Sequence, residues 1–255
     1  MIRNYLKSIF YASQRIFLGI GKINKGNHGK INFIDVGSVA RLPQPWLSNS
    51  HEIKNALLFE PNESKNHKTN VIKLNIALWS EEEERDFYIY KNSHGSSLFL
   101  QNYEFVETKF DELVNLGNKK LNLSWRKRSK LVKTVKLKCT TLDKALEQYN
   151  PRNIPFHFLK IDAQGAEFSI LKGAKKFISS ESCIGMQLEL FNLPLYKGIK
   201  LKKAVVDFLH NLGFKVLKEF PPHGSFLSQN DVVFIKREVK EQYNSIAELI
   251  YEVYN

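Results

Sequence analysis

Three carboxylate residues stand where apolar runs of this sequence end. Asp162 and Glu167 follow the run from Phe156 to Ile161, and Glu189 lies near the end of the later run CIGMQLELF. A carboxylate placed in this way can orient a reacting hydroxyl and remove its proton. We take Asp162 as the candidate base or orienting residue, with Glu189 and Glu167 in support. The alternative is that these carboxylates only cap a turn and a helix.

A second group of polar residues ends two earlier apolar runs. KINFIDVGS ends in Asp35 and Gly37, and ALLFEPN ends in Glu60. In nucleotide-binding α/β folds the first strand ends in a glycine that allows close backbone approach, and an acidic residue about 20 residues later binds the ribose hydroxyls. This spacing favours a ribose contact for Glu60 over an exposed strand-end carboxylate. The loop DVGSVARLPQPW lacks G-x-G-x-x-G, which argues against a dinucleotide oxidoreductase.

A parallel sheet would bring these residues together. The apolar run after Pro155 predicts a strand buried on both faces. A helix is expected from near Ala166, because apolar residues then recur at helical spacing: Ile170, Leu171, Ala174, Phe177 and Ile178. Ligands of open α/β sheets bind at the carboxyl ends of the strands. We therefore expect Asp35, Glu60, Asp162 and Glu189 at one crevice.

The remaining segments alternate between strand and helix patterns. VIKLNIALWS predicts a third strand, 103–117 a helix, and Leu201–Leu212 a helix that stops at Gly213. FKVLKEF and DVVFIKR, separated by a PPHGS turn, predict a closing antiparallel pair. The sequence thus predicts an α/β fold.

The segment LKIDAQGAEFSILKGA resembles the signature segment of the FkbM-type methyltransferases, and the resemblance extends from about Ile31 to Ile235. Leu42, Pro43 and Trp46 resemble a variant loop of that family, as do the GSSLF and NLPLYKG segments elsewhere, whereas Arg41 stands where a glycine is more usual. The resemblance implies the class I methyltransferase Rossmann-like fold. That fold has a mostly parallel seven-stranded sheet with an antiparallel last strand and helices on both faces.

The same resemblance implies S-adenosylmethionine as methyl donor and O-methylation of a sugar hydroxyl in a glycan or natural product. Ala77 would line the adenine. The expected cofactor contacts are Asp35, Gly37, Ser38, Glu60, Pro61, Ala77, Leu78 and Asp162. No metal is expected: the seven histidines show no metal spacing, although Asp162, Glu167 and Glu189 are residue types that bind hard cations.

The formal net charge of +12 is compatible with anionic partners such as nucleic acid, acidic lipid headgroups or acidic glycans, but charge alone does not fix a function. Between Lys119 and Lys138 there are nine Lys or Arg and no acidic residue. We expect this segment to be a solvated face or to lie over an acidic glycan or a phosphate-bearing carrier. One alternative function is an RNA methyltransferase that uses this segment, with Trp125 stacking on bases. Another is a non-catalytic binding module on the same fold, which Arg41 suggests.

We divide the chain into an amino-terminal amphipathic helix and linker (1–30), a methyltransferase domain (31–237) with a basic helical insertion at about 101–133, and a carboxyl-terminal helix (238–255). Cys139 and Cys183 are expected to be buried free thiols in a reducing compartment. No apolar run reaches the roughly 18 to 20 residues that span a bilayer. We expect a cytoplasmic protein. The first helix is expected to cover an exposed side of the domain. The alternative is that it lies on the anionic inner face of the membrane.

Overall fold

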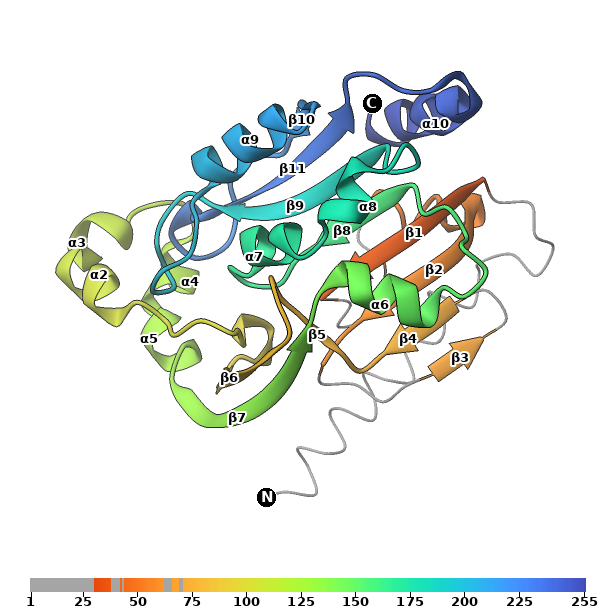
Figure 1. The fold of residues 1–255 in the computed structure, drawn as a ribbon. Coiled ribbons are helices and arrows are strands. Elements are labelled where there is room, and N and C mark those ends of the chain that lie inside the picture. Colours follow the sequence, from red (N-terminus) through yellow and green to blue (C-terminus); the bar gives the residue numbers. More distant parts are fainter. Residues whose placement is uncertain (1–29, 38–41, 43, 62–65, 69–70) are drawn as a thin grey trace.

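The computed structural model describes residues 30–37, 42, 44–61, 66–68 and 71–255, and Figure 1 shows the arrangement of their elements. The predicted amino-terminal helix and nearly all of its linker lie outside the described residues, as do Ser38, Arg41 and Pro43.

An eight-stranded sheet runs through the molecule in the order β10-β11-β9-β8-β1-β2-β4-β3. Its strands are β1 (Ile31–Val36), β2 (Ile53–Phe59), β3 (Asn66–Lys68), β4 (Val71–Leu74), β8 (Phe158–Ile161), β9 (Gly185–Phe191), β10 (Phe214–Glu219) and β11 (Gln229–Lys236). Strands β4, β2, β1, β8 and β9 are parallel neighbours. β1, β8 and β9 are buried throughout because each reads as a nearly continuous apolar run.

The predicted fold class is confirmed. The last strand along the chain, β11, runs antiparallel to both β9 and β10. The sheet has one strand more than the seven expected, because the short β3 pairs antiparallel with β4 at the far edge.

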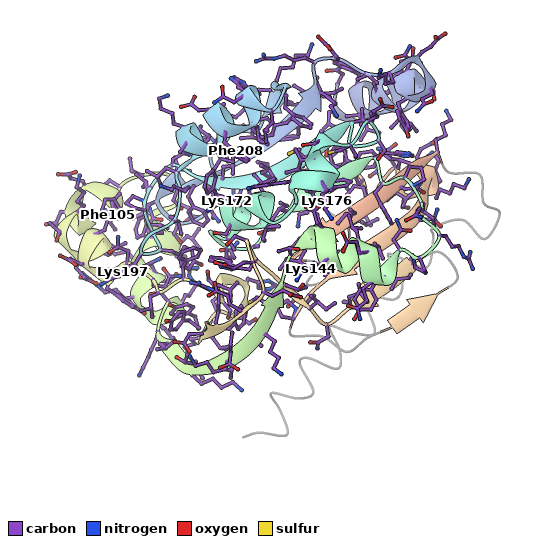
Figure 2. The ribbon with its side chains drawn as sticks, in the orientation of Figure 1. Phe105, Lys144, Lys172, Lys176, Lys197 and Phe208 are labelled. Atoms are coloured by element: carbon purple, nitrogen blue, oxygen red, sulfur yellow. The ribbon has the colours of Figure 1, made fainter. Side chains whose placement is uncertain are left out.

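Helices cover both faces of this sheet (Figure 1). One face packs against α6 (Leu142–Tyr149), α7 (Glu167–Lys172), α8 (Lys175–Ser179) and α9 (Lys202–Asn211). Phe168 of α7 packs against Phe208 of α9, with ring centroids 5.2 Å apart. Figure 2 labels Phe208. The other face packs against α10 (Asn244–Tyr254) and Trp46. Successive strand residues pack on opposite faces of the sheet: Phe33 lies on the α10 side and Ile34 on the α7 side.

The prediction that VIKLNIALWS forms a single third strand is wrong. It divides after Leu74, and the following β5 (Ala77–Leu78) leaves the main sheet to pair with Cys139 and Thr140. There it joins a small sheet of order β5-β7-β6, whose long strands are β6 (Glu83–Tyr90) and β7 (Leu131–Thr140). The departure of β5 opens space beside the carboxyl ends of β1 and β2.

Four short helices connect β6 to β7: α2 (Tyr103–Thr108), α3 (Phe110–Leu113), α4 (Lys119–Leu123) and α5 (Trp125–Arg128). The basic segment 119–138 therefore occupies α4, α5 and most of β7. Trp125, Val106 and Tyr90 form a separate apolar core with Phe191 and Phe226. That core attaches this insertion to the region beyond the end of β9.

Four single 3-10 turns complete the described elements: Ser50–Glu52, Ser93–Gly95, Ser225–Leu227 and Glu241–Tyr243. Both cysteines are buried and free, as expected. None of the helices in the described ranges is both long and apolar enough to cross a bilayer.

Candidate functional site

The carboxyl ends of three neighbouring strands meet at one point of the sheet edge. The Gly37 N–H donates to the Phe59 carbonyl (2.9 Å), and the Asp162 N–H donates to the Val36 carbonyl (3.0 Å). These bonds continue the β1–β2 and β1–β8 ladders by one step. Gly37, Glu60 and Asp162 are thereby brought side by side, as the sequence predicts.

Gly37 is needed here for close packing of the backbone. Its φ is +82°, and a Cβ atom at this position would lie 1.9 Å from the Asp162 carbonyl oxygen. The sequence predicts a glycine so that the backbone can approach a ligand. The structure shows that the glycine also allows the loop after β1 to touch the loop after β8.

A cavity of about 550 Å³ lies over these strand ends, within the range of about 300–1,000 Å³ typical of small-molecule sites. Seven of the predicted site residues line it: Gly37, Glu60, Pro61, Ala77, Leu78, Asp162 and Glu189. Ser38 lies outside the described residues. Asp35 and Glu167 are not on the cavity wall.

One end of the cavity has the character of a nucleoside site. Glu60 is buried at the end of β2, and the apolar side chains of Ile76, Ala77 and Leu78 line the same end. An acidic group beside an apolar slot is the arrangement that a ribose and a purine base require. The residues present therefore fit an adenosine-bearing cofactor.

Asp162 and Glu189 form a hydrogen-bonded carboxyl pair in the middle of the cavity wall. Burial and the negative charge of Asp162 raise the pKa of Glu189 well above its ordinary value. Burial alone would raise the pKa of Asp162 as well, but the Lys160 ammonium and hydrogen bonds from Gln164 and Glu189 outweigh it and lower that pKa. Glu189 is therefore the protonated member of the pair and Asp162 the charged one.

Lys160 supplies the positive charge that stabilises Asp162. Its Nζ lies 3.4 Å from Asp162 Oδ2 and 3.4 Å from Asp35 Oδ1. Burial disfavours the ammonium, but the carboxylates of Asp35 and Asp162 outweigh burial and raise the pKa of Lys160. The sequence predicts that Asp35 contacts the cofactor. Instead, its fully buried carboxylate lies beneath the cavity against Lys160.

Two glutamines and a tyrosine hold the carboxyl pair in place. Gln164 Nε2 donates to Asp162 Oδ1 (3.1 Å) and Glu189 Oε2 (2.7 Å), and Gln229 Nε2 donates to the same Glu189 oxygen (2.6 Å). The Tyr196 hydroxyl donates to the Gly95 carbonyl (2.8 Å) and lies 3.2 Å from Gln164 Oε1. Gln164 has a φ of +51°, a conformation that a non-glycine residue rarely adopts. Backbone strain of this kind concentrates at functional sites.

Glu167 organises the turn before α7. Its Oε1 accepts hydrogen bonds from the Ala163 N–H (2.9 Å) and the Gly165 N–H (3.1 Å). Burial raises the pKa of Glu167 to about 7 despite these bonds. This placement corresponds to the capping alternative, so any support for Asp162 from Glu167 passes through the backbone of the turn.

The opposite end of the cavity is built by the insertion and by the 3-10 turns. Arg128, Ser129 and Leu121 line it, together with residues 92–96 and Gly224 and Ser225. Trp125 also contributes but is 3% exposed and packs against Tyr103 and Phe226. The stacking of Trp125 on bases, part of the RNA alternative, does not agree with this position, because the ring fills a core.

The site also includes residues that were not predicted from the sequence. Lys160 interrupts the buried run FLKI, and a lysine inside a central parallel strand is itself a signal, since lysine is rarely fully buried unless paired. Gln164, Gln229 and Arg128 give no comparable signal. Among the residues that the structure describes, no three His, Cys, Asp or Glu side chains gather as a metal-binding set. The expectation of no metal stays a prediction.

A family model described as the methyltransferase FkbM domain matches residues 38–216. A search of curated proteins gives no match. Solved structures similar to this chain include methyltransferase FkbM from Methylobacillus flagellatus KT, with 10% identity and a TM-score of 0.45, covering 80% of this chain and 43% of that chain. This chain therefore spans less than half of that protein.

A candidate tRNA (m1A22) methyltransferase from Streptococcus pneumoniae is similar at 10% identity and a TM-score of 0.37, covering 94% of this chain and 78% of its own. A structure of the same protein in complex with S-adenosyl-L-methionine matches at 11% identity and a TM-score of 0.38, covering 92% and 78%.

Proposed function

The chain belongs to the FkbM methyltransferase domain family, and we propose that it transfers a methyl group from S-adenosylmethionine to a hydroxyl oxygen of a sugar in a glycan or related natural product. One observation carries the proposal. A single cavity joins the nucleoside-like end at Glu60 and Ala77 to the Asp162–Glu189 carboxyl pair, and then continues to the insertion. Donor and acceptor can thus meet at the carboxyl pair.

Glu60, Gly37, Pro61, Ala77 and Leu78 would hold the cofactor, which supplies an electrophilic methyl group when bound. Glu60 would accept hydrogen bonds from the ribose hydroxyls, and Ala77 and Leu78 would contact the base. Asp35 would then act indirectly: with Asp162 it fixes Lys160 at the cavity wall. Alignment of the acceptor oxygen with the methyl group supplies much of the acceleration.

Asp162 would orient the acceptor hydroxyl and receive its proton. Lys160 makes Asp162 a weak base, and a weak base suffices because a hydroxyl oxygen becomes strongly acidic as the new C–O bond forms. Glu189 keeps its own proton and directs it to Asp162. Gln164 and Gln229 hold both carboxyl groups in this arrangement.

Calorimetry with S-adenosylhomocysteine tests the cofactor half of the proposal. We expect saturable binding to the wild type and at least about tenfold weaker binding to Glu60→Gln, because a hydrogen bond to a charged group contributes about 1.5–3 kcal/mol. Glu219→Gln is the matched control: Glu219 is a strand-end glutamate that pairs with Lys202 away from the cavity. Absence of binding at millimolar ligand would instead support a non-catalytic module.

A further inference from the structure

Arg128 points to the chemical class of the acceptor. It is half-buried at the end of α5 and lines the insertion end of the cavity. Its Nε donates to Ser124 Oγ (2.9 Å), and its Nη2 donates to Ser225 Oγ (2.7 Å) and the Leu121 carbonyl (3.1 Å). These bonds hold the guanidinium in one orientation.

No carboxylate neutralises this guanidinium within the described part of the chain, and its Nη1 makes none of the hydrogen bonds found there. The neighbouring Arg126 differs, since it forms an ion pair with Glu107 outside the cavity. Lys160 is the other Lys or Arg among the described residues that line the cavity, and it is neutralised by Asp35 and Asp162. A half-buried guanidinium has lost part of its hydration, and charges removed from water are usually paired. Among the described residues of the cavity wall, Arg128 is therefore the cation whose counter-ion would come from a ligand.

The wall around Arg128 is preorganised. Phe226 and Leu227, just after Ser225, have φ values of +61° and +51°. Asn122, which is fully buried, holds this turn by accepting from the Phe226 N–H (2.7 Å) and donating to the Leu116 carbonyl (2.6 Å). Strained residues persist where the surrounding structure holds them. Arg128 therefore meets a ligand without reorganisation of its surroundings.

We infer that Arg128 binds a phosphate or carboxylate group of the acceptor, so that the substrate of this site is an anionic sugar. The inference rests on the proposed function, because it places the acceptor hydroxyl at Asp162 and the anionic group at the far end of the same cavity. The two N–H groups of Nη1 are the donors left for an anion, and hydrogen bonds from a guanidinium to carboxylate or phosphate oxygens are charge-assisted and strong. A neutral sugar leaves that guanidinium uncompensated.

Ligand-observed NMR on the full chain, saturated with S-adenosylhomocysteine, tests the inference. The probes are glucose, glucose 6-phosphate and glucuronate, and the measured quantity is the ratio of the glucose dissociation constant to that of each anion. We expect the wild type to favour at least one anion by about 10-fold or more, the size of a charge-assisted hydrogen bond. Comparison of the two anions shows whether phosphate or carboxylate is preferred.

Arg128→Met is expected to bring this ratio close to one. Lys127→Met, an exposed position on the same helix, is expected to leave it unchanged. Arg128→Gln keeps a donor for Ser225 and replaces the Met variant if that variant does not fold. A wild-type ratio near one, or a ratio that survives loss of Arg128 while only thermal stability falls, overturns the inference. Failure of the wild type to bind S-adenosylhomocysteine at all would instead contradict the proposed function.

Discussion

At the scale of single residues, the two members of the Asp162–Glu189 pair differ in protonation state. Lys160 lies 3.4 Å from both Asp35 and Asp162, and Glu189 is protonated because burial raises its pKa. Asp162 is therefore negatively charged, and the Lys160 ammonium lies between its carboxylate and that of Asp35. Its side chain is 36% exposed and lines the cavity. This leaves Asp162 as the carboxylate able to meet an acceptor hydroxyl.

Asp162→Asn is expected to lower the rate of methyl transfer by about 10²–10⁴-fold, the usual contribution of a positioned acid or base. Affinity for S-adenosylhomocysteine should stay near that of the wild type, since the amide has nearly the same shape. Single-turnover transfer of a radiolabelled methyl group, together with calorimetry, separates the two effects. Turnover close to that of the wild type would remove Asp162 from the reaction.

Glu167 predicts a pH dependence of stability. Its pKa in the folded protein, about 7, lies above the ordinary value of 4.5, so the folded state binds more protons between these values. The protonated side chain stabilises the fold fully below pH 4.5, and this contribution is lost as the pH rises through 7. Glu167→Gln keeps the acceptor for Ala163 and Gly165 but cannot ionise.

Urea unfolding of both proteins at pH 5 and pH 8 measures this contribution. Relative to the wild type, Glu167→Gln should become more stable at pH 8 than at pH 5 by on the order of 2–3 kcal/mol. A difference between the two proteins that does not change with pH would show that the carboxyl group ionises as freely in the folded state as in the unfolded chain.

Residues at strand ends could be predicted from the sequence, and their partners could not. Gly37, Glu60, Asp162 and Glu189 each follow an apolar run, and parallel strands bring such positions to one edge. Arg128 reaches the same cavity from an insertion whose path depends on long-range packing. Asp35 follows the same strand-end pattern yet lies below the cavity, because side chains of a strand alternate between its faces.

At the scale of elements, the contact between the loops after β1 and β8 holds the site together. Gly37 and Gly198 both have a φ of +82°, but a Cβ would meet the Asp162 carbonyl at 1.9 Å at Gly37 and nothing within 4 Å at Gly198. The two alanine substitutions share the cost of left-handed backbone, about 1–2 kcal/mol. Only Gly37→Ala adds a steric clash.

Gly198→Ala should therefore lower the free energy of unfolding by about 1–2 kcal/mol and leave cofactor binding unchanged. Gly37→Ala should lower it by roughly 2–5 kcal/mol, with overpacking added, and weaken S-adenosylhomocysteine binding by displacing Asp162. Chemical denaturation and calorimetry provide both readouts. Equal losses of stability in the two variants would mean that the loops separate without cost.

Buried strands were the predictable elements, because β1, β8 and β9 are mostly apolar and buried along their whole length. The third strand failed for a physical reason. Asn75 alone interrupts the apolar residues between Leu74 and Ile76, and no Gly or Pro marks the point where the chain leaves one sheet. Ala77 and Leu78 instead pair with Cys139 and Thr140. This pairing joins residues far apart in the sequence, so a local residue pattern cannot predict it.

At the scale of the whole molecule, the cavity belongs to two structural parts. The main sheet supplies the nucleoside-like end and the carboxyl pair, and the insertion supplies Arg128 and Leu121. Asn122 ties the insertion to the turn at Phe226 (2.7 Å), and the core around Trp125 packs against Phe191 at the end of β9. In the proposed function, the acceptor end can therefore vary with the insertion while the sheet keeps the cofactor end.

The net charge of +12 belongs to the same scale. Lys119, Lys120 and Lys127 are exposed on α4 and α5, and no ion pair of theirs is found among the described residues. Such lysines bind polyanions by counterion release, so affinity for single-stranded RNA should fall steeply with salt.

Changing all three lysines to Gln should reduce the slope of log K against log salt by about 2, at roughly 0.7 per charge. Methyl transfer to a sugar should not change. Filter binding and radiolabelled transfer measure the two effects, and RNA methylation that disappears in the triple variant would establish the RNA alternative in place of the sugar.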